Sequence, residues 1–236
     1  SFDVDIAPQS SVEYEIDAFN LDSSKNTVIQ FSYAENERDI ACEEIELSKG
    51  SLSFNDRGKK APRVDVSEKR LFITFDNGSM IFNKKTGNID SYMIGDKELI
   101  NPVSDKDFRG IGLQFYRAPL DNDRNIDAVW RKYRLADATS FVRNINHTIR
   151  DDALVITENV TVKTPIKLSI AKVDVKYTIY STGEIKVDYN IVRDGGVKLV
   201  PRFSSQLELF REFRNVKYLG LGPVINLPDY REHAVM

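Results

Sequence analysis

The stretch LSIAKVDVKYTIY, residues 168–180, sets the pattern on which the fold depends. Apolar and polar side chains alternate along it, so in an extended chain each kind falls on its own face. The pattern therefore predicts a β-strand with one face in a core and the other in solvent. The apolar face would carry Val173, Val175, Tyr177 and Ile179, and the polar face Asp174, Lys176 and Thr178.

Runs of the same kind lie on both sides of this strand. We predict further strands over 153–164, 183–192 and 197–210, joined by the turn sequences TPIK, STG and RDGG. Because such short turns connect antiparallel neighbours, the four runs together predict an antiparallel meander.

Two shorter strand patterns precede the meander. In KRLFITFDNGSMIF, residues 69–82, two alternating runs flank Asn77-Gly78, which predicts a hairpin with these two residues in the turn. In residues 84–99, a short strand is predicted between glycine turns at Gly87 and Gly95.

The N-terminal part also has a period of two, with strands predicted over 10–19, 27–35 and 40–47. The stretch 48–63 is polar and rich in Gly, Ser and Lys, which favours a domain boundary there. The chain begins within a strand-like pattern and without a leader pattern, so we expect a fragment of a longer protein.

Composition excludes several classes of protein. The 236 residues include 33 basic and 36 acidic ones, spread along the chain, so no basic stripe for nucleic acid is present. No run of about 18 apolar residues exists, which argues against a membrane-spanning helix. Cys42 is the single cysteine, and His147 and His233 lie far apart, so we expect no disulfide, no metal and no cofactor in this chain.

One segment departs from the plain alternation. FYRAPLDNDRNIDAVW, residues 115–130, concentrates acids, arginines, a proline and the only tryptophan. Its second half opens a helical pattern over 125–138, with apolar residues at helical spacing and Asn125 or Asp127 as the candidate cap.

A calcium loop is one interpretation of this segment. Four oxygen-bearing residues stand at positions 1, 3, 5 and 7, namely Asp121, Asp123, Asn125 and Asp127. The rest of the pattern fails, because Ile126 replaces the turn glycine and Lys132 replaces the bidentate glutamate.

A catalytic carboxylate pair is another interpretation, since glycoside hydrolysis uses two acids and the spacing of Asp121 and Asp123 does not exclude it. The alternative is that both acids shape the turn and are neutralised by Arg117 and Arg124. Trp130 beside them could stack on a sugar or belong to the core.

The run RAPLDND, residues 117–123, with LQFYRAP before it and a tryptophan-bearing helix after it, resembles the β-galactosidases of glycoside hydrolase family 2. Three other segments resemble that family in the same order: 2–16, 89–102 and VKYLGLGPVINLPDYRE at 216–232. The last segment departs from the family pattern at Ile225, Leu227 and Tyr230 and keeps Asn226 and Asp229.

The resemblance implies a mainly β fold with one short helix. Residues 1–58 would be the C-terminal part of an immunoglobulin-like sandwich, and 62–236 a truncated antiparallel supersandwich of the galactose-mutarotase-like type. The two catalytic carboxylates of the family lie in a (β/α)₈ barrel, for which this chain shows no alternating pattern. The chain would thus be a non-catalytic, inactive C-terminal region of a retaining enzyme that hydrolyses terminal β-D-galactosides.

The resemblance also implies the site and the partners. The dense segment would complete the active-site wall and meet the barrel of the same parent protein and the galactoside substrate. Its candidate residues are Arg117, Asp121, Asn122, Asp123, Arg124, Asn125, Asp127 and Trp130. Family enzymes often use Mg and Na in the barrel, and a homo-oligomer in the cytoplasm is the expected setting, with a periplasmic one left open.

Two other functions stay open from the sequence. A stand-alone carbohydrate-binding module would use Tyr116, Trp130 and Tyr133 as an aromatic platform. A structural or interaction domain of a diverged family member would explain the altered segment 223–230.

Overall fold

The computed structural model describes residues 3–15, 22, 24–49, 60–101 and 111–220. The chain divides into two compact units, and each is considered by itself. Unit 1 comprises Ser1–Phe54 with Lys217–Met236, and unit 2 comprises Asn55–Val216.

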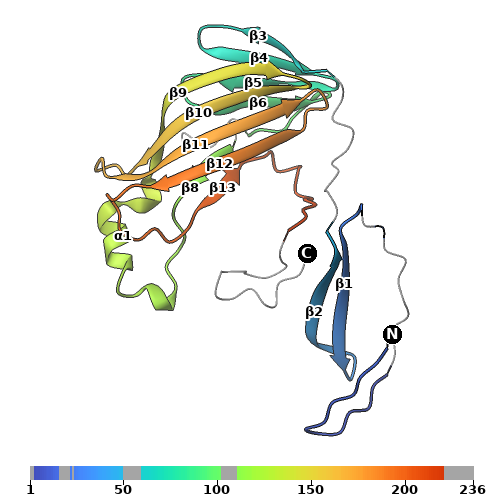
Figure 1. Ribbon diagram of the computed structural model, residues 1–236. Helices are drawn as coiled ribbons and strands as arrows, with labels where there is room; N and C mark the ends of the chain where they lie inside the picture. The colour runs from blue at the N-terminus through green and yellow to red at the C-terminus, as the bar shows by residue number, and fades with distance from the viewer. Residues whose placement is uncertain (1–2, 16–21, 23, 50–59, 102–110, 221–236) are drawn as a thin grey trace. The chain divides into compact units, whose positions relative to one another are not determined.

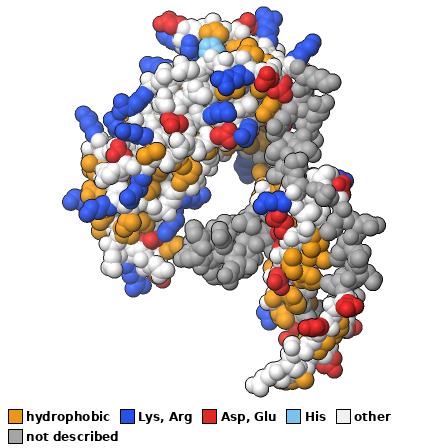
Figure 2. Space-filling view, in the orientation of Figure 1, with side chains coloured by type: hydrophobic (Ala, Val, Ile, Leu, Met, Phe, Trp, Pro, Cys, Tyr) orange, Lys and Arg blue, Asp and Glu red, His pale blue; other side chains and the backbone are white. Residues whose placement is uncertain are grey.

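Unit 1 contains an antiparallel hairpin of β1 (Thr27–Glu35) and β2 (Arg38–Ser48). Its turn residues Asn36 and Glu37 both have positive φ, which closes a two-residue connection. The two predicted strands at 27–35 and 40–47 are thus confirmed. Apolar side chains gather on the exposed surface of this unit (Figure 2).

The strand predicted over 10–19 is wrong for its described part. Residues 10–15 have no regular secondary structure and are exposed, because no described strand pairs with them. Residues 16–19 lie outside the described residues.

Unit 2 is built around two antiparallel sheets that lie face to face (Figure 1). The first has the strand order β3-β4-β5-β6-β7, with bounds Arg63–Val66, Arg70–Phe75, Gly78–Asn83, Asn88–Ile94 and Lys97–Glu98. The second has the order β12-β11-β10-β9, with β9 Thr139–Arg150, β10 Ala153–Lys163, β11 Ser169–Tyr180 and β12 Ile185–Arg193. A two-stranded ribbon joins β8 (Ile111–Gln114) to β13 (Ser204–Leu207).

The core lies between the two sheets because their inward positions are apolar. Leu71, Ile73 and Phe75 of β4 are buried at every second position, as the alternation predicts. From the second sheet, Tyr177 meets the ring of Phe82 edge-on at 5.4 Å between ring centroids. The buried face predicted for 173–179 is confirmed, although Thr178 on the opposite face is also buried.

The predicted hairpin at 69–82 forms, but its turn is shifted by one residue. Phe75 pairs with Gly78, so Asp76 and Asn77 make the turn and Gly78 starts β5. A Cβ on Gly78 would lie 2.0 Å from the carbonyl oxygen of Met93, so glycine is needed there for close approach of β6.

The fourth strand of the predicted meander is wrong in length and partner. Only Ser204–Leu207 of the run 197–210 is a strand, and it pairs with β8 rather than with β12. Pro201 lies within the run and cannot donate to a ladder, which limits the strand to its end. The fourth strand of the sheet is β9, which the sequence patterns above did not predict.

The predicted helix forms as α1 (Asp127–Tyr133), flanked by two 3-10 turns, η1 (Asp121–Asp123) and η2 (Leu135–Asp137). Neither predicted cap is used, since Ile126 holds the capping position without a side-chain bond. Arg134 ends the helix in the left-handed region, at φ 53°.

Candidate functional site

The segment between β8 and α1 is closed by one ion pair. The guanidinium of Arg117 reaches Asp123 through two contacts, Nη1 to Oδ2 at 2.5 Å and Nη2 to Oδ1 at 3.2 Å. This parallel arrangement matches the fork of arginine to the two oxygens of a carboxylate. The ion pair therefore holds Arg117 at the base of the turn.

Asp123 organises the turn from inside. Its Oδ2 also accepts the backbone N–H of Leu120 at 2.7 Å, and its side chain is only 13% exposed. The hydrogen bond from Arg117, followed by that from Leu120, holds the pKa of Asp123 below its usual value. Asp123 is therefore ionised at neutral pH and is committed to the turn.

Trp130 attaches the helix to a distant segment. Its ring is 3% exposed, and its Nε1 donates to the backbone carbonyl of Leu199 at 3.1 Å. The guanidinium carbon of Arg117 lies 5.7 Å from the ring centroid, and Tyr116 meets the ring edge-on. Arg117 is therefore fixed on one side by Asp123 and on another by Trp130.

Four of the other candidate residues face outward. Asp121, Asn122, Arg124 and Asn125 are exposed. Arg124 pairs with Asp121 at 3.3 Å, and both side chains are more than three-quarters exposed, so the pair contributes little to stability.

Asp127 lies partly buried at the start of α1. Its Oδ2 accepts an ion pair from Arg131 at 2.5 Å, one helical turn on, whereas its Oδ1 is buried without a partner. The carboxylate therefore forms an ion pair within α1 and does not cap the helix.

These contacts decide what the two acids can do. Asp121 is exposed and Asp123 is buried and paired with Arg117, so they do not form two free carboxylates on either side of one bond. The interpretation in which the arginines neutralise the acids fits both contacts. Across the described residues, no group of three or more His, Cys, Asp or Glu side chains is placed to hold a metal ion.

The sequence analysis missed a buried acid in the core, Glu158 of β10. The residue is 4% exposed, and its Oε1 accepts a hydrogen bond from the hydroxyl of Tyr177 at 3.0 Å. Its Oε2 is buried without a partner, and burial raises its pKa to about 7. The sequence could have indicated this buried acid, because Glu158 occupies an inward position in the alternation of β10.

The altered segment 223–230 and His233, both noted in the sequence, lie outside the described residues. The described part of the chain contains no helix that is long and apolar enough to cross a membrane.

Comparison with known proteins gives a consistent family. Residues 74–236 match the family described as "Beta galactosidase small chain". The chain is 25% identical over 230 residues to a β-galactosidase of Priestia megaterium, covering 96% of this chain and 21% of that protein. A β-galactosidase of Lactococcus lactis is 23% identical over 226 residues, covering 89% and 22%. The chain thus spans about a fifth of the length of these relatives.

Proposed function

Because the chain belongs to the β-galactosidase small chain family, we propose that it is the C-terminal region of a β-galactosidase and completes the wall of its active site. The parent enzyme would hydrolyse terminal β-D-galactosides with retention of configuration. The chemistry would belong to a (β/α)₈ barrel elsewhere in the parent, and this chain alone would be inactive.

The observation that carries the proposal is the clamp of Arg117 on Asp123. It fixes both ends of the seven-residue segment 117–123, so the four exposed polar side chains within this segment and just after it start from a rigid base. The side chains that would line the wall are Asp121, Asn122, Arg124 and Asn125.

The state of the acids supports a non-catalytic role. Asp123 is held as a paired carboxylate, which removes it as a proton donor at neutral pH, and Asp121 lies in open solvent. The described sheets are all antiparallel, unlike the parallel strands of a catalytic barrel. The segment would contact the barrel of the same parent protein and the galactoside bound there. Any Mg or Na ions would be bound by that barrel.

The binding-module alternative receives less support from the geometry. An aromatic platform needs exposed rings, and Trp130 is buried with its indole N–H bonded to Leu199. A structural role in a diverged relative is the competing function. It differs from the proposal in one measurable respect, because a purely structural chain would not increase the activity of the barrel-containing part.

The test is complementation. A separately produced barrel-containing part of the parent β-galactosidase is mixed with this chain, and cleavage of a chromogenic β-galactoside is followed. We expect activity from the mixture and none from this chain alone. Activity of the barrel-containing part that this chain does not increase would contradict the proposal and favour the structural role.

A further inference from the structure

β9 ends the second sheet of unit 2 and leaves one long strand edge without a neighbour (Figure 1). The strand has twelve residues, and in the order β12-β11-β10-β9 it pairs with β10 on one side only. In the part of the chain that the structure describes, no backbone hydrogen bond from another segment reaches its other side. Such an edge presents unpaired N–H and C=O groups to which a further strand can add.

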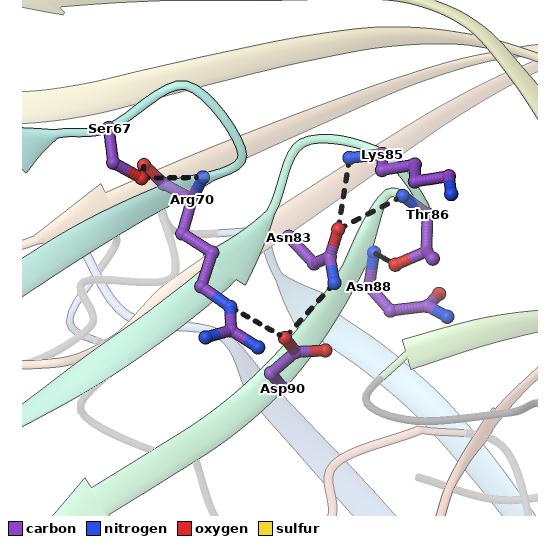
Figure 3. Close-up of polar contacts among 7 residues, drawn as sticks. All are labelled: Ser67, Arg70, Asn83, Lys85, Thr86, Asn88 and Asp90. Atoms are coloured by element: carbon purple, nitrogen blue, oxygen red, sulfur yellow. Dashed lines mark hydrogen bonds and ion pairs between the residues drawn. The ribbon is translucent and has the colours of Figure 1, made fainter.

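The other edges of the two main sheets are protected against such pairing. β3 has four residues and ends at a turn in which the Ser67 hydroxyl accepts the N–H of Arg70 (Figure 3). β7 has only two residues, and β12 carries the ion pair of Lys186 with Asp188. Short length and charged side chains, lysine above all, are common means of protecting a strand edge. β9 has neither, because it is long and contains no lysine, no acid and no proline.

The C-terminal part of β9 is regular enough to accept another strand. Residues 144–150 stand opposite 153–159 of β10 without a shift in register. The shift comes just before them, at Arg143, which has no opposite residue on β10 and whose Nε donates to the Thr161 hydroxyl at 2.7 Å. Because a bulge interrupts the ladder there, the segment available for pairing is 144–150.

This segment is complementary to a second copy of itself. Ile149 stands opposite the buried Leu154, on the face of the sheet that points to the core, yet 57% of it is exposed. Ile145 lies on the same face and is half-buried. In an antiparallel pair centred on His147, each Ile149 would face the Ile145 of the other copy, so the apolar contact occurs twice. A register centred on another residue would pair fewer than seven residues of the regular segment.

The same register keeps like charges apart. The arginines of β9 are Arg143 and Arg150, and the first lies outside the paired segment. Arg150 would face Asn144 of the second copy, whose amide oxygen can accept a hydrogen bond from the guanidinium. Asn146 would face Thr148, a pair in which both side chains can donate and accept. No arginine therefore stands opposite another arginine.

We propose that two copies of this chain associate through β9, with residues 144–150 of each copy paired antiparallel about His147. The two four-stranded sheets would then form one continuous sheet. Because seven residues from each copy make a small contact, the association is weak and depends on concentration. The inference goes beyond the proposed function, since it concerns self-association and requires no hydrolysis.

Analytical ultracentrifugation of the full chain over a range of concentrations measures the association. The experiment is made at pH 8, where imidazole side chains are ordinarily neutral. We expect the mass to rise from 26.9 kDa toward twice that value as the concentration rises.

Disulfide cross-linking tests the register. It is done in a Cys42→Ser background, because Cys42 is a free and exposed thiol. In the proposed pair the two thiols of His147→Cys would face each other with their Cα atoms about 4.5–5.5 Å apart, a separation that a disulfide can bridge. We therefore expect a covalent dimer under mild oxidation.

Two further cysteine variants make the register test specific. Ile149→Cys alone should give no cross-link, because its two copies would lie about 14 Å apart, four residues along the strands. Ile145→Cys alone should fail for the same reason. A mixture of these two variants should cross-link, because each thiol would then face a thiol of the other variant.

Lysine substitutions test the surface. Ile149→Lys places a charge at the new contact twice and should weaken the association by about tenfold or more. Val192→Lys is the matched control, since Val192 is 58% exposed on β12 at the opposite edge of the same sheet. Val28→Lys on β1 tests the exposed apolar surface of unit 1. Neither of these two variants should change the association.

Three results would overturn the inference. The first is a mass that stays at 26.9 kDa at every concentration. The second is an association that Val28→Lys or Val192→Lys weakens and Ile149→Lys does not, which would place the contact elsewhere. The third is cross-linking of Ile149→Cys alone as readily as of His147→Cys. These results are independent of the complementation assay, because no enzyme activity is measured.

Discussion

The guanidinium of Arg117 and the carboxylate of Asp123 meet through two contacts, at 2.5 and 3.2 Å, across a turn of only seven residues. The same carboxylate accepts the N–H of Leu120, and the same guanidinium lies over the ring of Trp130. This ion pair therefore connects the two ends of the turn and also connects the turn to the buried Trp130. Substitutions at either residue of the pair can test its role.

Replacing Arg117 with lysine should loosen the turn while keeping the charge. A lysine ammonium is a single point donor and cannot make two parallel contacts with the carboxylate. If the segment completes an active site, we expect complemented β-galactosidase activity to fall by about tenfold to a hundredfold, as when a positioning contact is lost. The measurement is the chromogenic assay at saturating amounts of each fragment.

The matched control for this variant is Arg124→Lys. Arg124 pairs with Asp121 in solvent, so the exchange should change the activity by less than about twofold. Equal losses from both variants would mean that the clamp has no special role.

Acid should weaken the clamp in a defined pH range. The pKa of Asp123 is lowered in the folded chain by its bond from Arg117, so its contribution to stability is present above its ordinary value of 3.8 and is lost as the pH falls through the folded value. We therefore expect Asp123→Asn to lower the melting temperature at pH 7 and to have a smaller effect near pH 3.

Thermal unfolding of the chain at the two pH values, followed by circular dichroism, provides the measurement. Asp121→Asn serves as the comparison, because that carboxylate is 94% exposed and pairs with Arg124 in solvent. A deficit of Asp123→Asn that is the same at both pH values would show that the charge of this residue does not matter.

The sequence predicted those elements in which alternation and burial agree. The strand 168–180 pairs on both sides as expected, and the family resemblance based on 117–123 is confirmed by the match over 74–236. β9 escaped prediction because it is an edge strand whose side chains are mostly exposed, which leaves a weak pattern.

The sequence predicted where the candidate site lies in the chain, but not which side chains contact each other within it. The pattern placed Arg117 near the acids, yet it did not show which acid it would bind, since that depends on the η1 turn. It also placed Trp130 among the wall candidates, whereas the ring is buried and its N–H donates to the carbonyl of Leu199, 69 residues away. Such contacts between distant segments have no local sequence pattern.

Glu158 should make unit 2 less stable at alkaline pH. Burial raises its pKa from 4.5 to about 7, so its favourable contribution is complete below about 4.5 and is lost as the pH rises through 7. At about 1.4 kcal/mol per pKa unit, the loss amounts to about 3 kcal/mol. Glu158→Gln should remove this dependence, so that denaturant unfolding at pH 5 and pH 8.5 gives similar free energies.

Tyr177→Phe offers a second variant for the same carboxylate. The Tyr177 hydroxyl donates to the ionised carboxylate and lowers its pKa, opposing the effect of burial. Its removal should raise the pKa of Glu158 further and move the loss of stability to higher pH. A pH profile that matches that of the unaltered chain would contradict the assignment.

Gly87 should tolerate no side chain. It has φ +72°, and a Cβ there would lie 2.1 Å from Oε2 of Glu158 and 2.7 Å from Val142. We expect Gly87→Ala to cost roughly 2–5 kcal/mol, combining backbone strain with overpacking. Gly95→Ala is the control, since Gly95 also has positive φ but open space around it, and should cost only about 1–2 kcal/mol. Equal costs in denaturant titrations would show that the steric contact is relieved without strain.

Trp130 should stabilise unit 2 both by its volume and by its N–H. Trp130→Phe keeps most of the apolar surface but loses the bond to the Leu199 carbonyl, so we expect a cost of about 1–2 kcal/mol. Trp130→Ala also leaves a cavity and should cost about 3–5 kcal/mol. Urea unfolding followed by circular dichroism measures both, and Phe141→Leu, at a side chain that is 52% exposed, should stay within about 0.5 kcal/mol of the unaltered chain. If Trp130→Phe unfolds at the same urea concentration as the unaltered chain, the N–H bond does not hold the segment around Leu199, and the tryptophan acts through packing alone.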